Sequence, residues 1–343
     1  MSAPLRVLGR LYGEGAEVRA AAYRHGWLRR RRLRAPVISV GNLTAGGTGK
    51  TPLVHCIVER LASRGLAPAI LTRGYRRRSG PDAIVIPPKA GREPEPREVG
   101  DEAAWLARKL PEAPIGISAD RYAVGQLLEE NYPVGVFVLD DGFQHLALER
   151  DLDVVVLDAT RRLSDGEIIP AGLQREPCSA LARAGLMVIT RTELAAPKPV
   201  EDVARRFCPG APLVQARTQL DHVIDLQSGA VLDAADWVGR PVQAFCGIGN
   251  AQAFFGDLRL WGFDVVREHQ YPDHFVYPSL GFARRGAEGS AALLTTEKDG
   301  MNLRGLNLAE CGVPVLACAT RLELDDEAML VESMVKAVAR RRA

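Results

Sequence analysis

The hydrophobic positions of this chain follow two different periods that alternate along its length. Between residues 36 and 214, short continuous apolar runs alternate with segments in which apolar residues recur every three or four positions. Continuous runs indicate strands buried on both faces of a parallel sheet, and the longer period indicates amphipathic helices. The predicted strands are 37–40, 69–72, 115–117, 134–139, 154–157 and 186–190, and the predicted helices are 51–63, 101–110 and 121–130. This order predicts a doubly wound α/β sheet that binds ligands at the carboxyl ends of its strands.

A second, smaller α/β unit is predicted after a short hairpin near residues 223–232. Its predicted strands are 242–246, 265–268, 291–296 and 313–318, and its predicted helices are 251–261 and a closing helix from residue 326. The chain therefore divides into four predicted parts. These are an N-terminal helix at 1–34, a nucleotide-binding domain at 35–216, a hairpin linker at 217–236 and a C-terminal Rossmann-like domain at 237–343.

Composition places the protein among soluble globular chains with a sizeable core, because 47% of its 343 residues are hydrophobic and 25% are charged. The net charge of +2 does not indicate a surface that binds nucleic acid. Charge is nevertheless uneven, since residues 1–34 hold nine arginines against two glutamates. The six cysteines show no C-x-x-C spacing, so we expect reduced core thiols and no zinc site.

The N-terminal segment has the pattern of a basic amphipathic helix. Its predicted apolar stripe consists of Leu5, Leu8, Tyr12, Ala16, Ala20, Tyr23 and Trp27. Such a helix suits the plane of an anionic membrane surface. A helix packed on the domain with a solvated arginine face fits the same pattern, and Gly9, Gly13 and Gly15 weaken its helix propensity. No apolar run reaches the roughly 18 residues of a membrane span.

The stretch from Val37 to Pro52 has the features of a phosphate-binding loop: a β-branched strand, a glycine-rich turn, Lys50-Thr51 and a helix. Lys50 is expected to reach the β- and γ-phosphates, and the Thr51 hydroxyl to ligate Mg2+. The residues predicted to bind nucleotide are Thr44, Ala45, Gly46, Gly47, Thr48, Gly49, Lys50 and Thr51. Thr44 stands where the pattern usually has its first glycine. The alternative interpretation of the stretch is a tight turn with a surface lysine. The sequence has no N-K-x-D stretch of the kind that recognises guanine, so ATP is the expected nucleotide.

Acidic residues that could organise a metal ion follow another predicted strand. Asp140 and Asp141 end the apolar run at 134–139. Successive side chains of a strand diverge, so one carboxylate can serve Mg2+ while the other points elsewhere, and the sequence does not choose between them. His145 follows shortly after and is interpreted as a structural histidine. An Arg-, Pro- and Gly-rich stretch at 76–98 is predicted to be a mobile loop beside this site.

Other ionisable residues fall near predicted strand ends and helix starts. Asp101 either caps a helix or acts as a general base toward an acceptor hydroxyl. Arg73 and Arg121 could bind a substrate phosphate. In the second unit, the loop at 271–275 contains Asp273 and His274, and the segment 296–299 ends a strand with charged groups. A G-x-G pair at 247–249 favours a simple tight turn.

Taken in order, these stretches resemble one known family, the tetraacyldisaccharide 4'-kinases of lipid A biosynthesis in Gram-negative bacteria. The resemblance lies in eight segments, at 36–52, 71–75, 100–102, 140–145, 170–177, 246–250, 272–274 and 295–299. The family's loop also lacks the first glycine, which accounts for Thr44. Two positions differ, because Ala103 stands where the family often has proline and Phe275 where it often has a second histidine.

The resemblance implies a kinase that transfers the γ-phosphate of ATP to the 4'-hydroxyl of an acylated disaccharide 1-phosphate, giving lipid IVA. It implies a two-lobed P-loop fold joined by a β-hairpin. It also implies a peripheral location on the cytoplasmic face of the bacterial inner membrane, where the lipid substrate and an anionic surface are the partners. Neither a nucleic acid nor an obligate protein partner is expected.

The catalytic residues expected on this basis are Lys50, Asp101, Asp141 and His274, with Asp101 assisted by His274 in activating the sugar hydroxyl. The expected metal residues are Thr51, Asp140 and Asp141. A different class of protein shares the loop and the basic helix, namely a membrane-associated P-loop ATPase switch that acts on a protein partner. Such a switch has no need of a second lobe carrying Asp273 and His274.

Overall fold

The computed structural model describes residues 3–75, 77, 81–163, 167–281 and 289–342. It divides into two compact units, Met1–Ala216 with Leu324–Ala343, and Arg217–Glu323. The first unit contains the predicted nucleotide-binding domain. The predicted C-terminal domain at 237–343 is corrected at its end, because the last helix belongs to the first unit.

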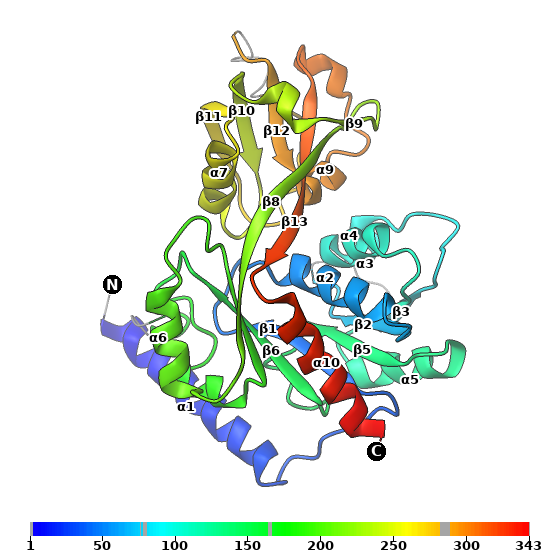
Figure 1. The fold of residues 1–343 in the computed structure, drawn as a ribbon, viewed down its shortest axis with the longest axis vertical. Coiled ribbons are helices and arrows are strands. Elements are labelled where there is room, and N and C mark those ends of the chain that lie inside the picture. Colours follow the sequence, from blue (N-terminus) through cyan, green and yellow to red (C-terminus); the bar gives the residue numbers. More distant parts are fainter. Residues whose placement is uncertain (1–2, 76, 78–80, 164–166, 282–288, 343) are drawn as a thin grey trace. The chain divides into compact units, whose positions relative to one another are not determined.

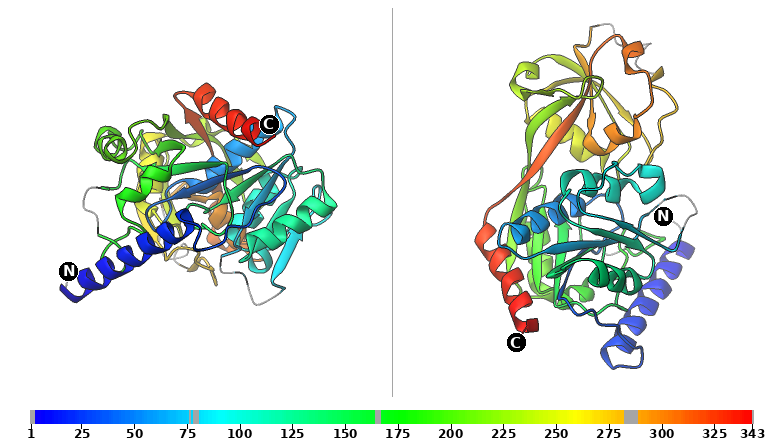
Figure 2. Two further views of the ribbon diagram at one scale, coloured as in Figure 1. Left: turned by 90° about the horizontal axis from the view of Figure 1, so that it is seen from below. Right: turned by 90° about the vertical axis from the view of Figure 1, so that its right-hand side faces the viewer.

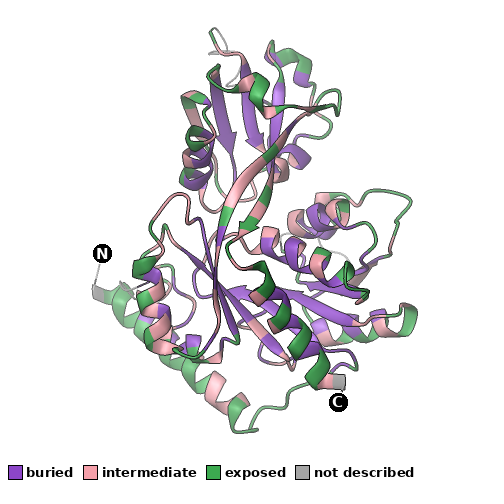
Figure 3. Cartoon of the chain, viewed as in Figure 1, coloured by how far each residue is buried: buried purple, intermediate pink, exposed green. Residues whose placement is uncertain are grey.

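The first unit is built on a sheet in the order β8-β7-β6-β1-β5-β2-β4-β3 (Figure 1). Its strands are parallel except for the edge strand β3, which runs antiparallel to β4. The strands are β1 (Val37–Asn42), β2 (Pro68–Thr72), β3 (Ala83–Ile86), β4 (Ile115–Ser118), β5 (Val136–Asp140), β6 (Leu152–Asp158), β7 (Leu186–Thr190) and the start of β8 (Leu213–Asp225). Every residue of β1, β2, β4, β5 and β7 is buried, as the continuous apolar runs predict (Figure 3).

Helices cover both faces of this sheet, which makes it doubly wound (Figure 2). The helical elements are α2 (Lys50–Ala62), α3 (Pro96–Val99), α4 (Asp101–Lys109), α5 (Arg121–Asn131), the 3-10 helix η1 (Cys178–Arg183), α6 (Lys198–Phe207) and α10 (Glu327–Arg342). Helix α5 packs its apolar side on β1, β2 and β5. Asp120 caps this helix, because its carboxylate accepts hydrogen bonds from the backbone N–H groups of Tyr122 and Ala123.

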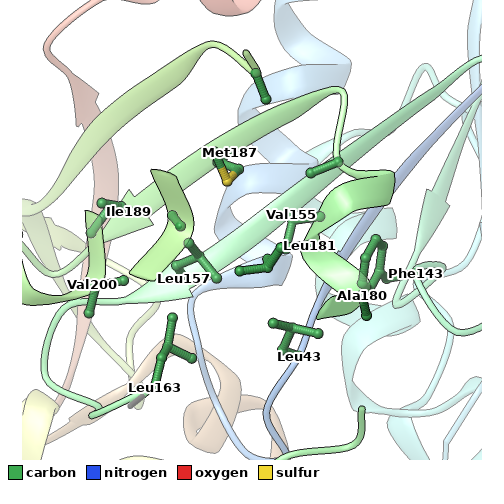
Figure 4. Close-up of a cluster of buried hydrophobic side chains, with 13 residues drawn as sticks. Leu43, Phe143, Val155, Leu157, Leu163, Ala180, Leu181, Met187, Ile189 and Val200 are labelled. Atoms are coloured by element: carbon green, nitrogen blue, oxygen red, sulfur yellow. The ribbon is translucent and has the colours of Figure 1, made fainter. Parts of the chain in front are cut away.

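A second buried cluster lies under η1 and α6 (Figure 4). It joins Val155 and Leu157 of β6 to Met187 and Ile189 of β7, and it reaches Leu43 at the start of the phosphate loop. The predicted pattern missed α6, whose charged face leaves few apolar positions, and it assigned 76–98 to a loop. That stretch contains β3 and α3, while residues 76 and 78–80 lie outside the described part of the chain.

The second unit has a sheet in the order β11-β10-β12-β13-β8, with β9 paired to β8. Its elements are β9 (Val231–Leu232), the 3-10 helix η2 (Ala234–Trp237), β10 (Pro241–Cys246), α7 (Ala251–Leu260), β11 (Asp264–Gln270), β12 (Ala292–Thr296), α9 (Glu297–Asn302), the 3-10 helix η3 (Leu308–Cys311) and β13 (Val315–Leu324). Strands β10, β11, β12 and β13 are parallel, so their carboxyl ends meet at one edge. The predicted hairpin is the antiparallel pair β8 and β9, in which Val223 faces Leu232.

Two segments connect the units, and the predicted linker at 217–236 falls within the second unit, where β8 pairs with β9. The chain leaves the first unit along β8 and returns to it at the end of β13. Helix α10 is then held on the first unit by ion pairs of Arg60 with Glu327 and of Arg341 with Asp151. These contacts place the closing helix with the nucleotide-binding domain, which its sequence position did not indicate.

The N-terminal helix α1 (Ala3–Arg24) lies on the outside of the first unit (Figure 2). Its contact face matches the predicted stripe only in part. Gly9 and Gly13 are buried, and the stripe residues Ala16, Ala20 and Tyr23 are half-buried. The stripe residues Leu8, Tyr12 and Trp27 are exposed. A Cβ at Gly9 would lie 2.7 Å from the carbonyl oxygen of Ile168, and one at Gly13 would lie 2.5 Å from that residue's Cδ1. The glycines therefore allow close docking and do not break the helix. Residues 1 and 2 of the predicted segment lie outside the described part.

Candidate active site

The phosphate loop connects β1 to α2 at the carboxyl edge of the first sheet. Gly46 and Gly49 have φ angles of 92° and 82°, in the left-handed region that favours glycine. Gly49 directly precedes α2, so Lys50 and Thr51 begin that helix. Backbone N–H groups at a helix start favour anions, and the helix dipole adds to that preference.

Neighbouring segments hold this loop in shape. The Asn42 amide donates to the carbonyl oxygen of Thr44 at 2.6 Å and to the Thr48 hydroxyl at 2.8 Å. From the end of β7, the Thr190 hydroxyl donates to the carbonyl oxygen of Thr48 at 2.9 Å. The other side is braced by residues 173–175, whose backbone bonds to Leu43 and Ala45. Thr44, which replaces a glycine, is buried at a bridge to Gln174.

Asp141 is paired with two cations beside the loop. Lys50 Nζ lies 3.5 Å from its Oδ1, and Arg175 Nη1 lies 2.8 Å from its Oδ2. Burial by itself raises the pKa of this carboxyl, but Lys50 and Arg175 outweigh burial and lower the pKa below its usual value. Asp141 is therefore ionised and holds the lysine of the phosphate loop. Arg175 belongs to the stretch at 170–177, but sequence reasoning assigned it no role.

Asp140, one residue earlier, has a different environment. It is buried at the end of β5, and the Thr72 hydroxyl lies 3.3 Å from its Oδ2. Burial, followed by the charges of Glu102 and Asp141, raises its pKa to about 7. A bound cation would counter this repulsion, so Asp140 is a candidate metal ligand. As expected for successive side chains, Asp140 and Asp141 point into different environments, and their pKa values shift in opposite directions.

Helix α4 begins at Asp101, and its N-cap is Gly100. Asp101 is therefore the first helical residue and not the capping residue that sequence reasoning allowed. Glu102 follows, and its charge acts on Asp140. Glu102 lies in the predicted helix at 101–110 and in the family stretch at 100–102, but sequence reasoning assigned it no role. Its position next to Asp101 was the one hint in the sequence that Glu102 has a role. Only the fold brings Glu102 near the end of β5.

Arg121, at the start of α5, is buried and electrostatically coupled to this group. Burial lowers its pKa, the charge of Arg73 lowers it further, and Asp141 and Asp140 oppose both effects. Its Nε has no hydrogen-bond partner within the part of the chain that the structure describes. Arg73 is exposed just after β2. The two predicted substrate-binding arginines thus flank the acids.

His145 is partly buried, and its surroundings favour the neutral imidazole. Burial, with the charges of Arg121 and Arg150, lowers its pKa to about 4. It is therefore uncharged near pH 7, which fits its structural interpretation.

In the second unit, His274 and Asp273 lie in the loop after β11. His274 Nε2 is 3.6 Å from Asp273 Oδ2, and the His274 backbone N–H donates to the carbonyl oxygen of Gly247. Gly247 follows β10 directly, and Asn250 caps α7 by accepting from the N–H of Ala253. The G-x-G pair is thus a turn between a strand and a helix, as expected. Sequence-predicted residues gather at the carboxyl edges of both sheets.

A pocket of about 690 Å³ lies elsewhere in the first unit. Pro68, Pro114 and Val134 line it, and these residues precede or begin β2, β4 and β5. It therefore opens at the amino ends of the strands, opposite the phosphate loop, and takes no part in the candidate site.

A phosphate loop followed by Lys50-Thr51, with two acids ending the strand beside it, defines a P-loop nucleoside triphosphate-binding protein. The family model for tetraacyldisaccharide-1-P 4'-kinase (LpxK) matches residues 1–339. The chain belongs to this family.

Individual relatives agree over nearly the whole length. The tetraacyldisaccharide 4'-kinase of Pelobacter propionicus is 38% identical over 328 residues, covering 94% of this chain and 89% of that protein. That of Geobacter sulfurreducens is 36% identical, covering 98% and 93%. The crystal structure of "apo" form LpxK from Aquifex aeolicus in complex with ATP has a TM-score of 0.78 and 30% identity, covering 96% of this chain and 97% of that one. These similarities do not favour an ATPase switch.

Proposed function

We propose that this protein transfers the γ-phosphate of ATP to the 4'-hydroxyl of a tetraacyldisaccharide 1-phosphate, giving lipid IVA. The observation that carries the proposal is the pairing of Lys50 with Asp141 beside the phosphate loop, in a chain that matches the 4'-kinase family over residues 1–339. The A. aeolicus relative was crystallised with ATP, which supports the choice of nucleotide.

Mg2+ is assigned to Thr51 and Asp140. A hydroxyl at the start of α2 and a buried carboxyl whose pKa is raised by neighbouring acids fit a hard cation that prefers oxygen ligands. Asp141 is engaged by Lys50 and Arg175, so its role is to orient the lysine. When bound, Mg2+ neutralises developing charge on the transferring phosphoryl group. Of the two acids that the sequence left open, we therefore propose Asp140 as the metal ligand.

Lys50 supplies the positive charge directed at the β- and γ-phosphates. Asp101 accepts the proton of the acceptor hydroxyl, a role compatible with its position inside α4 and not at its cap. His274 of the second unit assists this proton transfer, and the family stretch at 272–274 supports that assignment. Arg73 and Arg121 bind the anionic part of the substrate.

The location we propose is the cytoplasmic face of the inner membrane, bound peripherally through α1. Val7, Leu11 and Val18 are 56%, 59% and 67% exposed. At 100° per residue they lie opposite Gly9 and Gly13, which face the protein. An apolar surface turned outward, flanked by arginines, suits an anionic membrane surface. Within the described residues, no helix combines the length and apolar character that a membrane crossing requires.

Purified protein incubated with labelled ATP, Mg2+ and the acylated disaccharide 1-phosphate tests the function. The expected result is transfer of label to the 4'-position, confirmed by mass and by resistance of the product to further phosphorylation. Nucleotide hydrolysis without transfer, by protein whose melting curve is intact, would instead support the ATPase alternative.

A further inference from the structure

The second unit contains a buried carboxylate that the proposed mechanism does not use. Asp299, in α9, is 1% exposed. Its Oδ1 accepts from the Gly247 N–H and from the Tyr277 hydroxyl, each at 2.9 Å, and its Oδ2 accepts from the Thr296 hydroxyl at 2.7 Å. A buried charge is tolerated only when hydrogen bonds replace its hydration. The three donors that converge on this carboxylate therefore compensate for its burial.

These donors come from three segments that are distant in sequence. Gly247 follows β10, Thr296 ends β12, and Tyr277 lies beyond the loop after β11. Burial and the neighbouring Asp299 raise the pKa of Tyr277, so its phenol stays protonated and donates. The carboxylate thus connects the carboxyl ends of β10 and β12 to the segment that follows β11.

A single residue, Gly247, is hydrogen-bonded to both Asp299 and His274. Gly247 donates its N–H to Asp299 and accepts the N–H of His274 at its carbonyl oxygen, 2.9 Å away. A Cβ at Gly247 would lie 2.9 Å from Phe275 Cβ and 3.0 Å from the carbonyl oxygen of Pro272. Gly247 is therefore in tight contact with both sides of the loop that carries His274.

Aromatic packing also stabilises the loop that carries His274. The rings of Tyr271 and Phe275 stack with centroids 4.7 Å apart, and the ring of Tyr277 meets both edge-on at 5.2 and 5.1 Å. His274 lies between these residues in sequence and has a φ of 59°. Residues other than glycine rarely adopt this left-handed conformation, so the surroundings must maintain it.

We propose that Asp299 is the positioning residue that holds His274 in this conformation, acting through Gly247 and Tyr277. The inference rests on the proposed function, in which His274 takes part in proton transfer. It predicts that Asp299 affects turnover only through His274 and leaves ATP binding to the first unit unchanged.

The test is a double-mutant cycle between Asp299→Asn and His274→Ala, with kcat and the KM for ATP measured for each protein. Asn keeps one acceptor oxygen but presents an amide to the Thr296 hydroxyl, so we expect kcat to fall roughly 10-fold at an unchanged KM. In the His274→Ala background, Asp299→Asn is expected to have no further effect. Tyr277→Phe, which keeps the ring and removes one donor, is expected to lower kcat roughly 2- to 10-fold and covers the case in which Asp299→Asn does not fold.

The matched control is Asp257→Asn, since Asp257 is another buried carboxyl of this unit, on α7 and outside the His274 loop. It should leave kcat unchanged. Equal losses from Asp299→Asn in both backgrounds, or an unchanged kcat in both Asp299→Asn and Tyr277→Phe, would overturn the inference while leaving the proposed function intact. A wild-type kcat in His274→Ala alone would overturn the assignment of His274, and the inference with it.

Discussion

The ammonium of Lys50 lies 3.5 Å from Oδ1 of Asp141. The lysine is the first residue of α2 and the acid follows β5, so the pair joins the phosphate loop to the neighbouring strand. Asp141 has a φ of 50°, which turns its side chain away from the direction that Asp140 takes. This relationship separates the roles of two adjacent carboxylates.

Replacement of Lys50 by alanine is expected to lower kcat by about three orders of magnitude, because the charge directed at the transferring phosphoryl group is lost. The melting temperature should change little, since Asp141 keeps Arg175 as a partner. Steady-state kinetics and calorimetry measure the two effects. Lys198→Ala is the control, because this lysine is exposed on α6. Comparable turnover in both variants would contradict the assignment.

Asp140→Asn should make the protein more stable at pH 8 while abolishing most activity. The folded-state pKa of Asp140 is raised to about 7, so folded protein retains a proton that unfolded protein releases above about pH 4. This carboxyl therefore lowers stability progressively as pH rises from about 4 to 7. Asparagine removes that penalty, which corresponds to a melting temperature roughly 2–6 °C higher at pH 8.

The gain should shrink as the pH falls toward 4, because the carboxyl of the unfolded protein then also becomes protonated. Thermal melts of both proteins between pH 5 and 8, without nucleotide or metal, give the comparison. A gain of the same size at every pH would show that Asp140 does not titrate in this range.

Asp101→Asn is expected to lower kcat by roughly 10²–10⁴, the usual contribution of a general base. The melting temperature should stay nearly constant, because Gly100 and not Asp101 occupies the cap position of α4. Asp202→Asn, on the exposed surface of α6, is the control. A variant that loses stability but retains its turnover per folded molecule would restore the structural interpretation of Asp101.

The outward face of α1 gives a prediction about membrane binding. Glutamates at Leu11 and Val18 should release the protein from vesicles that contain anionic phospholipid, because charge is added to an exposed apolar surface. Both sites are exposed, so stability should hardly change. Leu127→Glu, on α5, is the matched control, since Leu127 is 41% exposed. Sedimentation with vesicles measures the binding of each variant. If the double variant still binds, this face of α1 is not the membrane-binding surface.

Two glycines of α1 should respond oppositely to alanine. Gly15 has no heavy atom within 4 Å of an added Cβ, so Gly15→Ala should stabilise the protein by up to about 1 kcal/mol through helix propensity. At Gly9 the added Cβ meets a backbone oxygen at 2.7 Å, and Gly9→Ala should be destabilising by about 1–3 kcal/mol. Chemical denaturation tests both variants, and equal effects would mean that α1 is not docked through Gly9.

The sequence by itself determined the doubly wound class, most strand and helix positions and the phosphate loop. Buried parallel strands require continuous apolar runs, and a phosphate loop requires glycines followed by Lys50-Thr51. Each of these features depends on one short stretch of the sequence. It also brought Asp101, Asp140, Asp141 and His274 into consideration, because each belongs to a stretch of a known family. Their catalytic roles remain predictions.

Only the tertiary structure decided the features that depend on contacts between distant segments. Arg175 meets Asp141 across 34 positions, and Glu102 raises the pKa of Asp140 from another element. Helix α10 returns to the first unit, and α1 docks through glycines whose sequence signature suggests a weak helix. Hydrophobic periodicity reports which positions are buried but not which segments bury them. For that reason, the partners of Asp141 and of Asp299 became visible only in the fold.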